Sequence, residues 1–303
     1  MKKKQNIVIV GLGLLGTSLA LALKKNSNYR VMGWARKCEV RNKLLKNGTI
    51  EHTDDSLIEL LKVADITILS LPIPIIQKYI VEYGKYFKKG SCVTDVGSVK
   101  SAIVYDAENE LSKFGVNFIG SHPMAGTENS GPDAAFSTLY DNAIVFLTPT
   151  QQTSKRTINQ VSEMWKSIKT TTIEIFPEKH DEIVAFTSHI SHLIAMALSL
   201  SVLGTEPNKR ELRKKACCSA FRDCTRVASS SPSMWKEIIS NNKDEVLSAI
   251  ESFKNELNII TDSIKNNNFD EFENMFASAR NLRNNWLEER DIHNNQCKKI
   301  SKK

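Results

Sequence analysis

The sequence predicts a two-domain protein in which a doubly wound α/β sheet is followed by an all-helical domain. Short apolar runs rich in β-branched residues alternate with helix-length stretches over the first 176 of the 303 residues. A glycine-rich turn follows the first run, and the strand pattern stops near Pro177. Alternating strands and helices are typical of βαβ units, in which a largely parallel sheet is covered by helices on both faces. We therefore expect domains at residues 1–176 and 177–303.

The first domain is predicted to hold a series of strands with helices between them. The expected strands are residues 7–10, 29–34, 65–71, 91–96, 117–120, 143–147 and 170–176, and helices are expected at 14–25, 75–87, 100–114 and 154–167. Residues 66–69 read Ile-Thr-Ile-Leu without alternation. Such continuous runs suit strands that are buried on both faces, as in a parallel sheet between two layers of helices.

The second domain shows only helical patterns. Residues 180–203 form a long apolar segment that Gly204 and Pro207 end, and further helices are expected at 210–228, 234–241, 244–266 and 270–289. From residue 183 to 203, apolar side chains occupy almost the whole circumference of the expected helix, as in a helix buried on every side.

The helical domain therefore has more apolar surface than one chain is expected to bury. We expect a second copy of the chain to cover this surface in a symmetric homodimer; a monomeric bundle, in which the helices bury one another, is the alternative.

Composition and charge exclude several classes of protein. Much of the net charge of +7 comes from lysines at the two ends, without interleaved aromatic residues, so we expect no nucleic-acid partner. The six cysteines form no Cys-x-x-Cys pair, and we expect them to be reduced thiols in a cytoplasmic protein.

The first residues resemble a signal peptide, because lysines precede an apolar run, but glycines interrupt that run. No later run reaches the roughly 20 apolar residues of a membrane span, so we expect no membrane contact.

A Gly-Leu-Gly-Leu-Leu-Gly motif at residues 11–16 follows the first expected strand and opens the first helix, which predicts a dinucleotide site in a Rossmann-type domain. Gly11 permits the tight turn, Gly13 lets a pyrophosphate approach the backbone, and Gly16 lets helix and strand pack closely. A glycine turn without a ligand is the alternative. The expected cofactor-binding residues are Gly11, Gly13, Leu14, Leu15, Gly16, Arg36, Lys37 and Ser70.

The end of the second strand bears on the choice of cofactor. An acidic residue about 20 positions beyond the glycines binds the ribose hydroxyl of NAD. Here Ala35 stands in that position, with Arg36, Lys37 and Arg41 close by in sequence. Because a guanidinium can pair with a 2′-phosphate, we expect NADP, with NAD possible if Arg36 is a solvated residue and the enzyme is unselective.

Two further segments fall at the carboxyl edge of the expected sheet, where α/β proteins bind ligands. Residues 95–100 read Asp-Val-Gly-Ser-Val-Lys, and residues 120–128 read Gly-Ser-His-Pro-Met-Ala-Gly-Thr-Glu. A histidine such as His122, at a strand end in a Gly/Pro-rich loop, is placed as a general acid or base and titrates near neutral pH. A structural histidine bonded to a carbonyl is the alternative.

These two segments together closely resemble the prephenate and arogenate dehydrogenases of tyrosine biosynthesis. The likeness continues at His180-Asp181, at Thr-Ser-His-Ile-Ser-His (residues 187–192), and at Phe-Arg-Asp-Cys-Thr-Arg (residues 221–226), which Trp235 follows. It spans residues 7–235 in the same order. The chain departs from the family pattern at residues 219–220, where Ser-Ala stands for the usual glycines, and in lacking the acidic residue of NAD-using members.

The resemblance implies an NAD(P)-dependent oxidative decarboxylation of prephenate to 4-hydroxyphenylpyruvate, or of L-arogenate to L-tyrosine. It implies that His122 accepts the proton of the ring hydroxyl and that Ser98 lies between His122 and the nicotinamide. Arg226 would bind a substrate carboxylate. The other implied site residues are His180, Ser188, His189 and His192 lining the pocket, Thr127 and Glu128 closing it, Asp223 supporting the arginine and Trp235 in the wall. Related dehydrogenases also pair through the helical domain.

Other interpretations stay open at this point. The chain could act on an amino analogue such as 4-amino-4-deoxyprephenate, or on a β-hydroxyacid, although the latter explains neither His122 nor Arg226. A non-catalytic NADP-sensing protein would not need Ser98, His122 and Arg226. A metal site at the histidines is not expected, because nine residues of a regular helix place His180 opposite His189.

Overall fold

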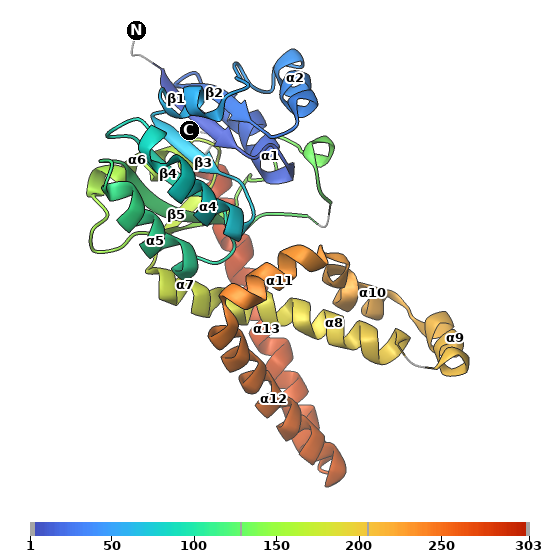
Figure 1. The fold of residues 1–303 in the computed structure, drawn as a ribbon. Helices are drawn as coiled ribbons and strands as arrows, with labels where there is room; N and C mark the ends of the chain where they lie inside the picture. The colour runs from blue at the N-terminus through green and yellow to red at the C-terminus, as the bar shows by residue number, and fades with distance from the viewer. Residues whose placement is uncertain (1–3, 128, 205, 301–303) are drawn as a thin grey trace. The chain divides into compact units, whose positions relative to one another are not determined.

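The computed structural model describes residues 4–127, 129–204 and 206–300. The chain forms two compact units, residues 1–243 and 244–303. The first unit holds the sheet and helices α1 to α11, and the second consists of α12 and α13 (Figure 1). The predicted class, a doubly wound sheet followed by helices, is confirmed. The boundary between residues 176 and 177 stays a prediction.

Seven strands form one sheet in the order β2-β1-β3-β4-β5-β6-β7. They are β1 (Gln5–Val10), β2 (Tyr29–Trp34), β3 (Ile66–Leu69), β4 (Cys92–Asp95), β5 (Asn117–Pro123), β6 (Ile144–Thr148) and β7 (Thr171–Glu174). All neighbouring pairs are parallel except β5 and β6, which run antiparallel. The order reverses between β1 and β3, and such a switch point opens a crevice at the carboxyl edge where ligands bind.

Helices cover both faces of the sheet because the side chains of each strand alternate between two apolar cores. On β1, Ile7 and Ile9 belong to one core and Val8 and Val10 to the other, and all four are fully buried. The first core is completed by α1 (Leu14–Leu23), α2 (Cys38–Lys46) and α6 (Lys155–Lys166); the second by α3 (Leu57–Leu61), α4 (Ile73–Tyr83) and α5 (Ser101–Ser112). The short helices α2 and α3 were not expected from the sequence pattern.

The helical part of the first unit begins with one long helix that changes its winding. It consists of α7 (Pro177–Val184), a π-helical turn (Ala185–His189) and α8 (Ile190–Leu203), and is followed by α9 (Pro207–Ala216), α10 (Ser219–Thr225), the 3₁₀ turn Arg226–Ser229 and α11 (Pro232–Asn241). The single helix expected over residues 210–228 is wrong. Cys217 and Cys218 have extended backbones that end α9 before α10 begins, which a periodic sequence pattern does not reveal.

Within one chain, residues 183–203 are not buried on every side, and their apolar side chains are left for the second copy that the homodimer prediction expects. Only Ala195 of α8 is buried, whereas Met196 and Leu200 are 49% and 63% exposed. By length and composition the helix Pro177–Leu203 could cross a membrane, contrary to the expectation from sequence. However, core helices of soluble proteins can have the same length and apolar composition. Helix α7, the first part of this segment, packs against α5 and β6 and buries the ionisable side chains His180 and Asp181.

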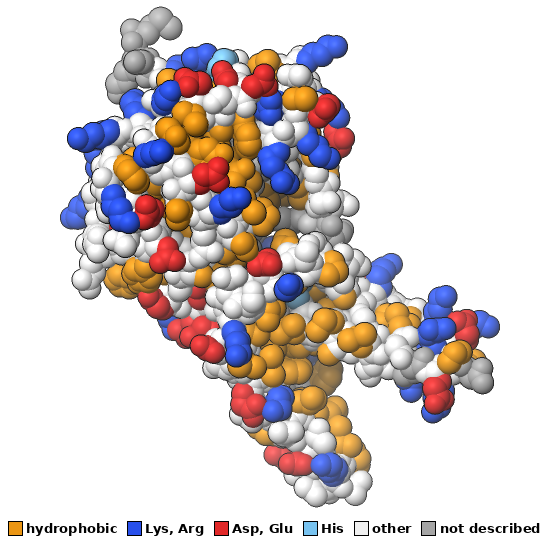
Figure 2. Space-filling view, in the orientation of Figure 1, with side chains coloured by type: hydrophobic (Ala, Val, Ile, Leu, Met, Phe, Trp, Pro, Cys, Tyr) orange, Lys and Arg blue, Asp and Glu red, His pale blue; other side chains and the backbone are white. Residues whose placement is uncertain are grey.

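The second unit is built from two long helices that expose several large apolar side chains. Helix α12 (Lys243–Lys265) is joined to α13 (Phe269–Ile300) by a turn in which Asn267 adopts a left-handed conformation, with φ of 54°. Its exposed apolar side chains are Leu247, Phe253, Leu257, Ile259, Ile264, Phe269, Phe276, Leu282 and Trp286. Figure 2 shows such orange side chains gathered along the helical region. Apolar exposure on this scale marks an interaction surface.

Candidate active site

The glycine turn at the end of β1 has the geometry of a dinucleotide site. Gly11 has a φ of +101°, and a Cβ atom there would collide with the carbonyl oxygen of Ser70 at the end of β3. A Cβ on Gly16 would collide with the carbonyl oxygen of Gly11, so the first turn of α1 packs directly on the strand. Gly13, by contrast, has open space where its side chain would be and lies at the start of α1 without a side-chain cap.

These features fit a bound pyrophosphate. The first N–H groups of a helix have no partner within the helix and carry a partial positive charge, so they attract an anion. The open space at Gly13 lets an anion reach these groups, whereas the tight contacts at Gly11 and Gly16 hold the turn in shape. Leu14 is buried and Leu15 is half-buried against the first core, so these two leucines hold α1 in place through their side chains.

The segment after β2 differs in part from its sequence interpretation. Arg36 and Lys37 are exposed, as a phosphate-binding role requires. Arg41 is 5% exposed, donates to the carbonyl oxygen of Ala35 at 2.7 Å and pairs with Asp55. The idea that Arg41 pairs with a 2′-phosphate is therefore wrong: its guanidinium is already used to hold the loop that bears Ala35 and Arg36.

A buried ion pair organises the carboxyl ends of β4 and β5. Asp95 and Lys100 pair with no exposure of either side chain. Asp95 also accepts hydrogen bonds from the N–H groups of Gly97 (2.8 Å) and Ser121 (3.2 Å), while Lys100 Nζ donates to the carbonyl oxygen of Ser121 at 2.9 Å. This cluster fixes the backbone on both sides of Ser98 and directly before His122, the two predicted catalytic residues.

His122 is the penultimate residue of β5 and is 9% exposed. Its Nδ1 lies 2.8 Å from Nε2 of His180, and the two rings meet edge to face with centroids 5.0 Å apart. Burial lowers the pKa of His122 well below its ordinary value, and the neighbouring His180, Lys100 and His189 lower it further. The imidazole is consequently neutral at pH 7, and Nδ1 is the ring nitrogen that His180 engages.

The π-helical turn brings the other histidines to the same region. Because a π-helix closes its hydrogen bonds over one more residue than an α-helix, it rotates the residues beyond it. The expectation that His180 and His189 lie on opposite faces assumed one regular helix, and the π-helical turn removes that condition. Burial brings the pKa of His189 to about 4, and His180 contributes to the lowering. Within the described residues 4–127, 129–204 and 206–300, no group of three or more His, Cys, Asp or Glu could hold a metal ion.

Two of the predicted pocket histidines are enclosed within the protein. His180 is completely buried and His189 is 1% exposed. Asn242, which the sequence interpretation missed, lies 3.2 Å from Nδ1 of His189 and donates to the carbonyl oxygen of Asp181 at 2.9 Å. These two histidines can influence a substrate only through their neighbours.

The half-buried residues His192, Ser188 and Trp235 form a more accessible group. The His192 ring stacks on Trp235 with centroids 4.0 Å apart, and His192 Nδ1 lies 3.0 Å from the carbonyl oxygen of Ser188. Burial lowers the pKa of His192, and the charge of Arg226, in the 3₁₀ turn that packs against α8, lowers it further. The exposed Asp223 contacts Arg222 at 3.3 Å. Thr127 is exposed in its loop, and Glu128 lies outside the described residues.

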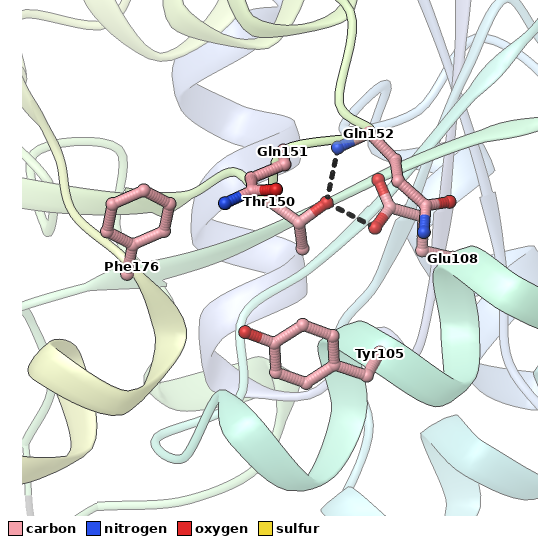
Figure 3. A pocket seen from close by; sticks show the side chains of 6 residues that line it. All are labelled: Tyr105, Glu108, Thr150, Gln151, Gln152 and Phe176. Atoms are coloured by element: carbon pink, nitrogen blue, oxygen red, sulfur yellow. Dashed lines mark hydrogen bonds between the residues drawn. The ribbon is translucent and has the colours of Figure 1, made fainter.

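Two surface cavities of about 400 Å³ occur in the first unit. One is lined by Phe221, Arg222, Thr225, Arg226 and Ser229 and therefore includes the predicted carboxylate-binding arginine. The other, drawn in Figure 3, is lined by Tyr105, Glu108, Thr150, Gln151, Gln152 and Phe176. In this second cavity the Thr150 hydroxyl already donates to Glu108, and none of the predicted site residues lines it.

Comparisons with known proteins agree with this architecture. A family model described as "Prephenate dehydrogenase, nucleotide-binding domain" matches residues 19–174, and one described as "Prephenate dehydrogenase, dimerization domain" matches residues 176–278. The chain belongs to the prephenate dehydrogenase family. It is 34% identical to the prephenate dehydrogenase of Bacillus subtilis over 92% of this chain and 76% of that protein. It is 30% identical to the cyclohexadienyl dehydrogenase of Zymomonas mobilis over 92% of this chain and 95% of that one.

Solved structures of this family have the same fold. Prephenate dehydrogenase from Aquifex aeolicus, in complex with hydroxyphenyl propionate and NAD+, has a TM-score of 0.86 and 31% identity, covering 93% of this chain and 98% of that one. Synechocystis arogenate dehydrogenase has a TM-score of 0.82 and 27% identity, covering 93% and 100%. Family membership makes this chain a nicotinamide-dependent oxidoreductase of aromatic amino-acid biosynthesis.

The glycines allow a matched pair of tests. Gly11→Ala should lower the free energy of unfolding by about 1–3 kcal/mol, because a side chain there forces a strained backbone and meets Ser70. Gly13→Ala should leave the free energy of unfolding nearly unchanged but weaken dinucleotide binding, because its Cβ fills the space open to the pyrophosphate. Urea unfolding and fluorescence titration with the dinucleotide measure the two effects. Equal dinucleotide affinity in the Gly13→Ala variant would contradict the assignment.

The buried histidines should make the protein sensitive to acid. The pKa values of His122, His180 and His189 are lowered in the folded state, chiefly by burial. The unfolded chain therefore binds protons first as the pH falls below about 6.5, and each such histidine removes up to about 1.4 kcal/mol of stability per pH unit from there toward its folded pKa. Urea unfolding measured at about ten pH values between pH 8 and pH 5 should show this decrease in the free energy of unfolding as the pH falls. In a His189→Gln variant, the free energy of unfolding should depend less steeply on pH, by the contribution of about one proton. An unchanged pH dependence would contradict the interpretation.

Proposed function

We propose that the chain catalyses the NAD(P)-dependent oxidative decarboxylation of prephenate or arogenate. The observation that carries this proposal is the neutral, nearly buried His122 at the carboxyl edge of the sheet, held through Nδ1 so that Nε2 is left for a substrate. A general base needs a lone pair within reach of the substrate proton and a pKa below the working pH. His122 meets the second condition because burial and its cationic or histidine neighbours disfavour the charged ring.

The proposed reaction requires no covalent intermediate between the protein and its substrate. With the pyrophosphate of the dinucleotide held at the glycine turn, its nicotinamide would supply the hydride acceptor. The chain itself binds the substrate, removes the proton of the ring hydroxyl at His122 Nε2 and neutralises carboxylate charge. Loss of the ring carboxylate as carbon dioxide and aromatisation then make the conversion downhill, so positioning and one proton transfer are sufficient. Ser98, which follows β4 beside the base-bearing strand, is proposed to orient His122 and the nicotinamide.

Arg226 is proposed to bind a substrate carboxylate. It lines a cavity, and its charge acts on His192, which in turn stacks on Trp235. A planar guanidinium can bind a carboxylate through two parallel hydrogen bonds. Among the described residues, the buried indole N–H of Trp235 has no hydrogen-bond acceptor, and a polar group of the substrate is proposed to accept from it. Ser188, Thr127, Glu128 and Asp223 are proposed to complete this part of the pocket.

The proposed cofactor is NADP, with NAD also usable. The exposed Arg36 and Lys37 follow β2, and Arg41 holds that loop from inside through the Ala35 carbonyl. We also propose a cytoplasmic homodimer paired through the helical region, since α8, α12 and α13 leave large apolar side chains exposed. This proposal is consistent with the description of the matched model as a dimerization domain.

The proposed reaction is tested by NAD(P)H formation, measured by absorbance, with prephenate, arogenate and 4-amino-4-deoxyprephenate offered separately. His122→Asn should lower kcat at least about 10²-fold, because proton removal is lost, while the dissociation constant of the nucleotide changes little. A variant that keeps most of its kcat would rule out His122 as the base. Turnover of the amino analogue alone, or of none of the three, would overturn the proposed substrate.

The proposed cofactor preference is tested at one position. Wild-type protein should have a lower KM for NADP than for NAD, and Ala35→Asp should shift the ratio toward NAD, because the new carboxylate repels a 2′-phosphate and can bind a ribose hydroxyl. Steady-state kinetics with each dinucleotide measure the ratio. Arg36→Ala is the companion variant and should weaken NADP more than NAD. A wild type that prefers NAD by about tenfold or more would contradict this assignment.

The proposed dimer is tested by light scattering at micromolar concentration. The measured mass should be about twice the 34.0 kDa of one chain, because the exposed apolar side chains of the helical region are covered by a second copy. Replacing Leu200 of α8 by Glu should shift the mass toward that of one chain. A mass of one chain that does not change with wild-type concentration would rule the dimer out.

A further inference from the structure

A continuous line of buried hydrogen bonds connects the start of α5 to His122. The N–H groups of Lys100 and Ser101 each donate to the Asp181 carboxylate at 2.8 Å. Asp181 Oδ1 lies 2.7 Å from Nδ1 of His180, and Nε2 of His180 lies 2.8 Å from Nδ1 of His122. Three different elements, α5, α7 and β5, therefore meet in one chain of polar contacts inside the protein.

The donors and acceptors in this line can be assigned from its acidic end. Each oxygen of Asp181 accepts a backbone N–H bond, as an ionised carboxylate does. Burial alone would raise the pKa of Asp181, but the hydrogen bonds from His180, Lys100 and Ser101 together lower it. An ionised Asp181 can only accept, so Nδ1 of His180 must carry a proton and donate it.

The assignment then passes from His180 to His122. His180 is completely buried and its pKa is lowered, mainly by burial, so the ring is neutral and carries a single proton, on Nδ1. Its Nε2 consequently accepts, and Nδ1 of His122 donates to it at 2.8 Å. A neutral His122 with its proton on Nδ1 has its lone pair on Nε2, the nitrogen that faces away from His180. This is the tautomer that a base acting through Nε2 requires.

The acidic end of the line is itself fixed by its surroundings. Lys100 and Ser101 lie at the N-terminus of α5, where free N–H groups and the helix dipole stabilise a negative charge. The Lys100 side chain is anchored separately in the ion pair with Asp95. The buried Asn242 donates to the carbonyl oxygen of Asp181 and so holds the backbone of α7 at this residue.

We infer that Asp181 and His180 are positioning residues that set the tautomer of His122 and offset the charge that develops on it. The inference rests on the proposed role of His122. When the substrate hydroxyl gives up its proton, the O–H bond breaks, its electron pair stays on oxygen and an N–H bond forms at His122 Nε2. The resulting imidazolium donates from Nδ1 to His180, beyond which the Asp181 carboxylate supplies the compensating charge. Without Asp181, a positive ring would be buried with no anion along this line.

A purely structural role for His180 is the competing explanation. The ring also packs edge to face against Phe146 of β6, with centroids 5.5 Å apart, so it fills space between the sheet and α7. Two variants separate the explanations. His180→Phe keeps the ring but removes the acceptor for His122, whereas His180→Gln loses the ring but can place an amide oxygen near the former Nε2.

The kinetic test compares these variants with Asp181→Asn. In Asp181→Asn the amide can donate to Nδ1 of His180, which would move the proton of His180 to Nε2 and that of His122 to its own Nε2. We expect Asp181→Asn and His180→Phe to lower kcat about 10²–10⁴-fold with little change in the dissociation constant of the nucleotide, and His180→Gln to lose far less. If His180→Phe retains more activity than His180→Gln, the ring only fills space and the inference is overturned.

A second measurement does not depend on turnover. Nitrogen-15 NMR of histidine-labelled protein, assigned with the His122→Asn variant, reports which ring nitrogen carries the proton. The wild type should show His122 and His180 both protonated at Nδ1, and Asp181→Asn should move the proton of His122 to Nε2 while circular dichroism confirms the fold. A wild type with His122 protonated at Nε2, or no change in folded Asp181→Asn, overturns the inference. The expected tautomers without turnover of any offered substrate would overturn the proposed function instead, and would leave standing only the assignment of Asp181 and His180 as the residues that set the tautomer of His122.

Discussion

The candidate site depends on the buried ion pair between Asp95 and Lys100. Neither side chain is exposed, so each charge has lost its hydration and must be stabilised by the other and by backbone groups. Burial by itself lowers the pKa of Lys100, and Asp95 opposes that shift. Leaving either partner alone in this position would cost about 3–5 kcal/mol of folding free energy, because an unpaired charge would remain buried. The pair fixes Ser121, directly before His122, through its N–H and its carbonyl oxygen.

The same pair connects the sheet to the helical region. Lys100 presents its side chain to Asp95 and its backbone N–H to Asp181, so a single residue joins β4 and β5 to α7. The helix from Pro177 to Leu203 is apolar in composition, yet the buried carboxylate of Asp181 lies near its start. This carboxylate accepts hydrogen bonds from backbone N–H groups of the nucleotide-binding part of the chain. The π-helical turn that follows carries His189, which packs edge to face on Trp235. Such turns are often found at functional sites, since they redirect side chains from an otherwise regular helix.

The four histidines of the candidate site differ in how deeply they are buried. His180 and His189 are enclosed and act on their neighbours, His122 is almost enclosed, and His192 is half-buried beside Arg226. Burial lowers the pKa of all four, so the region holds neutral rings at pH 7. The proposed acceptor of the substrate proton, His122, and the proposed carboxylate-binding cation, Arg226, are thereby chemically distinct groups. The exposed apolar surface of α8, α12 and α13 is the separate physical feature on which the proposed dimer depends.

The strands of the sheet, the glycine turn and the strand-end segments around Ser98 and His122 could all be predicted from the sequence. Each of these is encoded locally, in a hydrophobic period or in residues a few positions apart. The tertiary structure alone decided the use of Arg41 inside its loop, the π-helical turn, the break at Cys217 and Cys218, and the antiparallel pairing of β6. It also decided the line from Asp181 through His180 to His122, whose contacts join residues 58 and 81 positions apart. No local pattern records such contacts, because they form only when the helices and strands that carry them pack together.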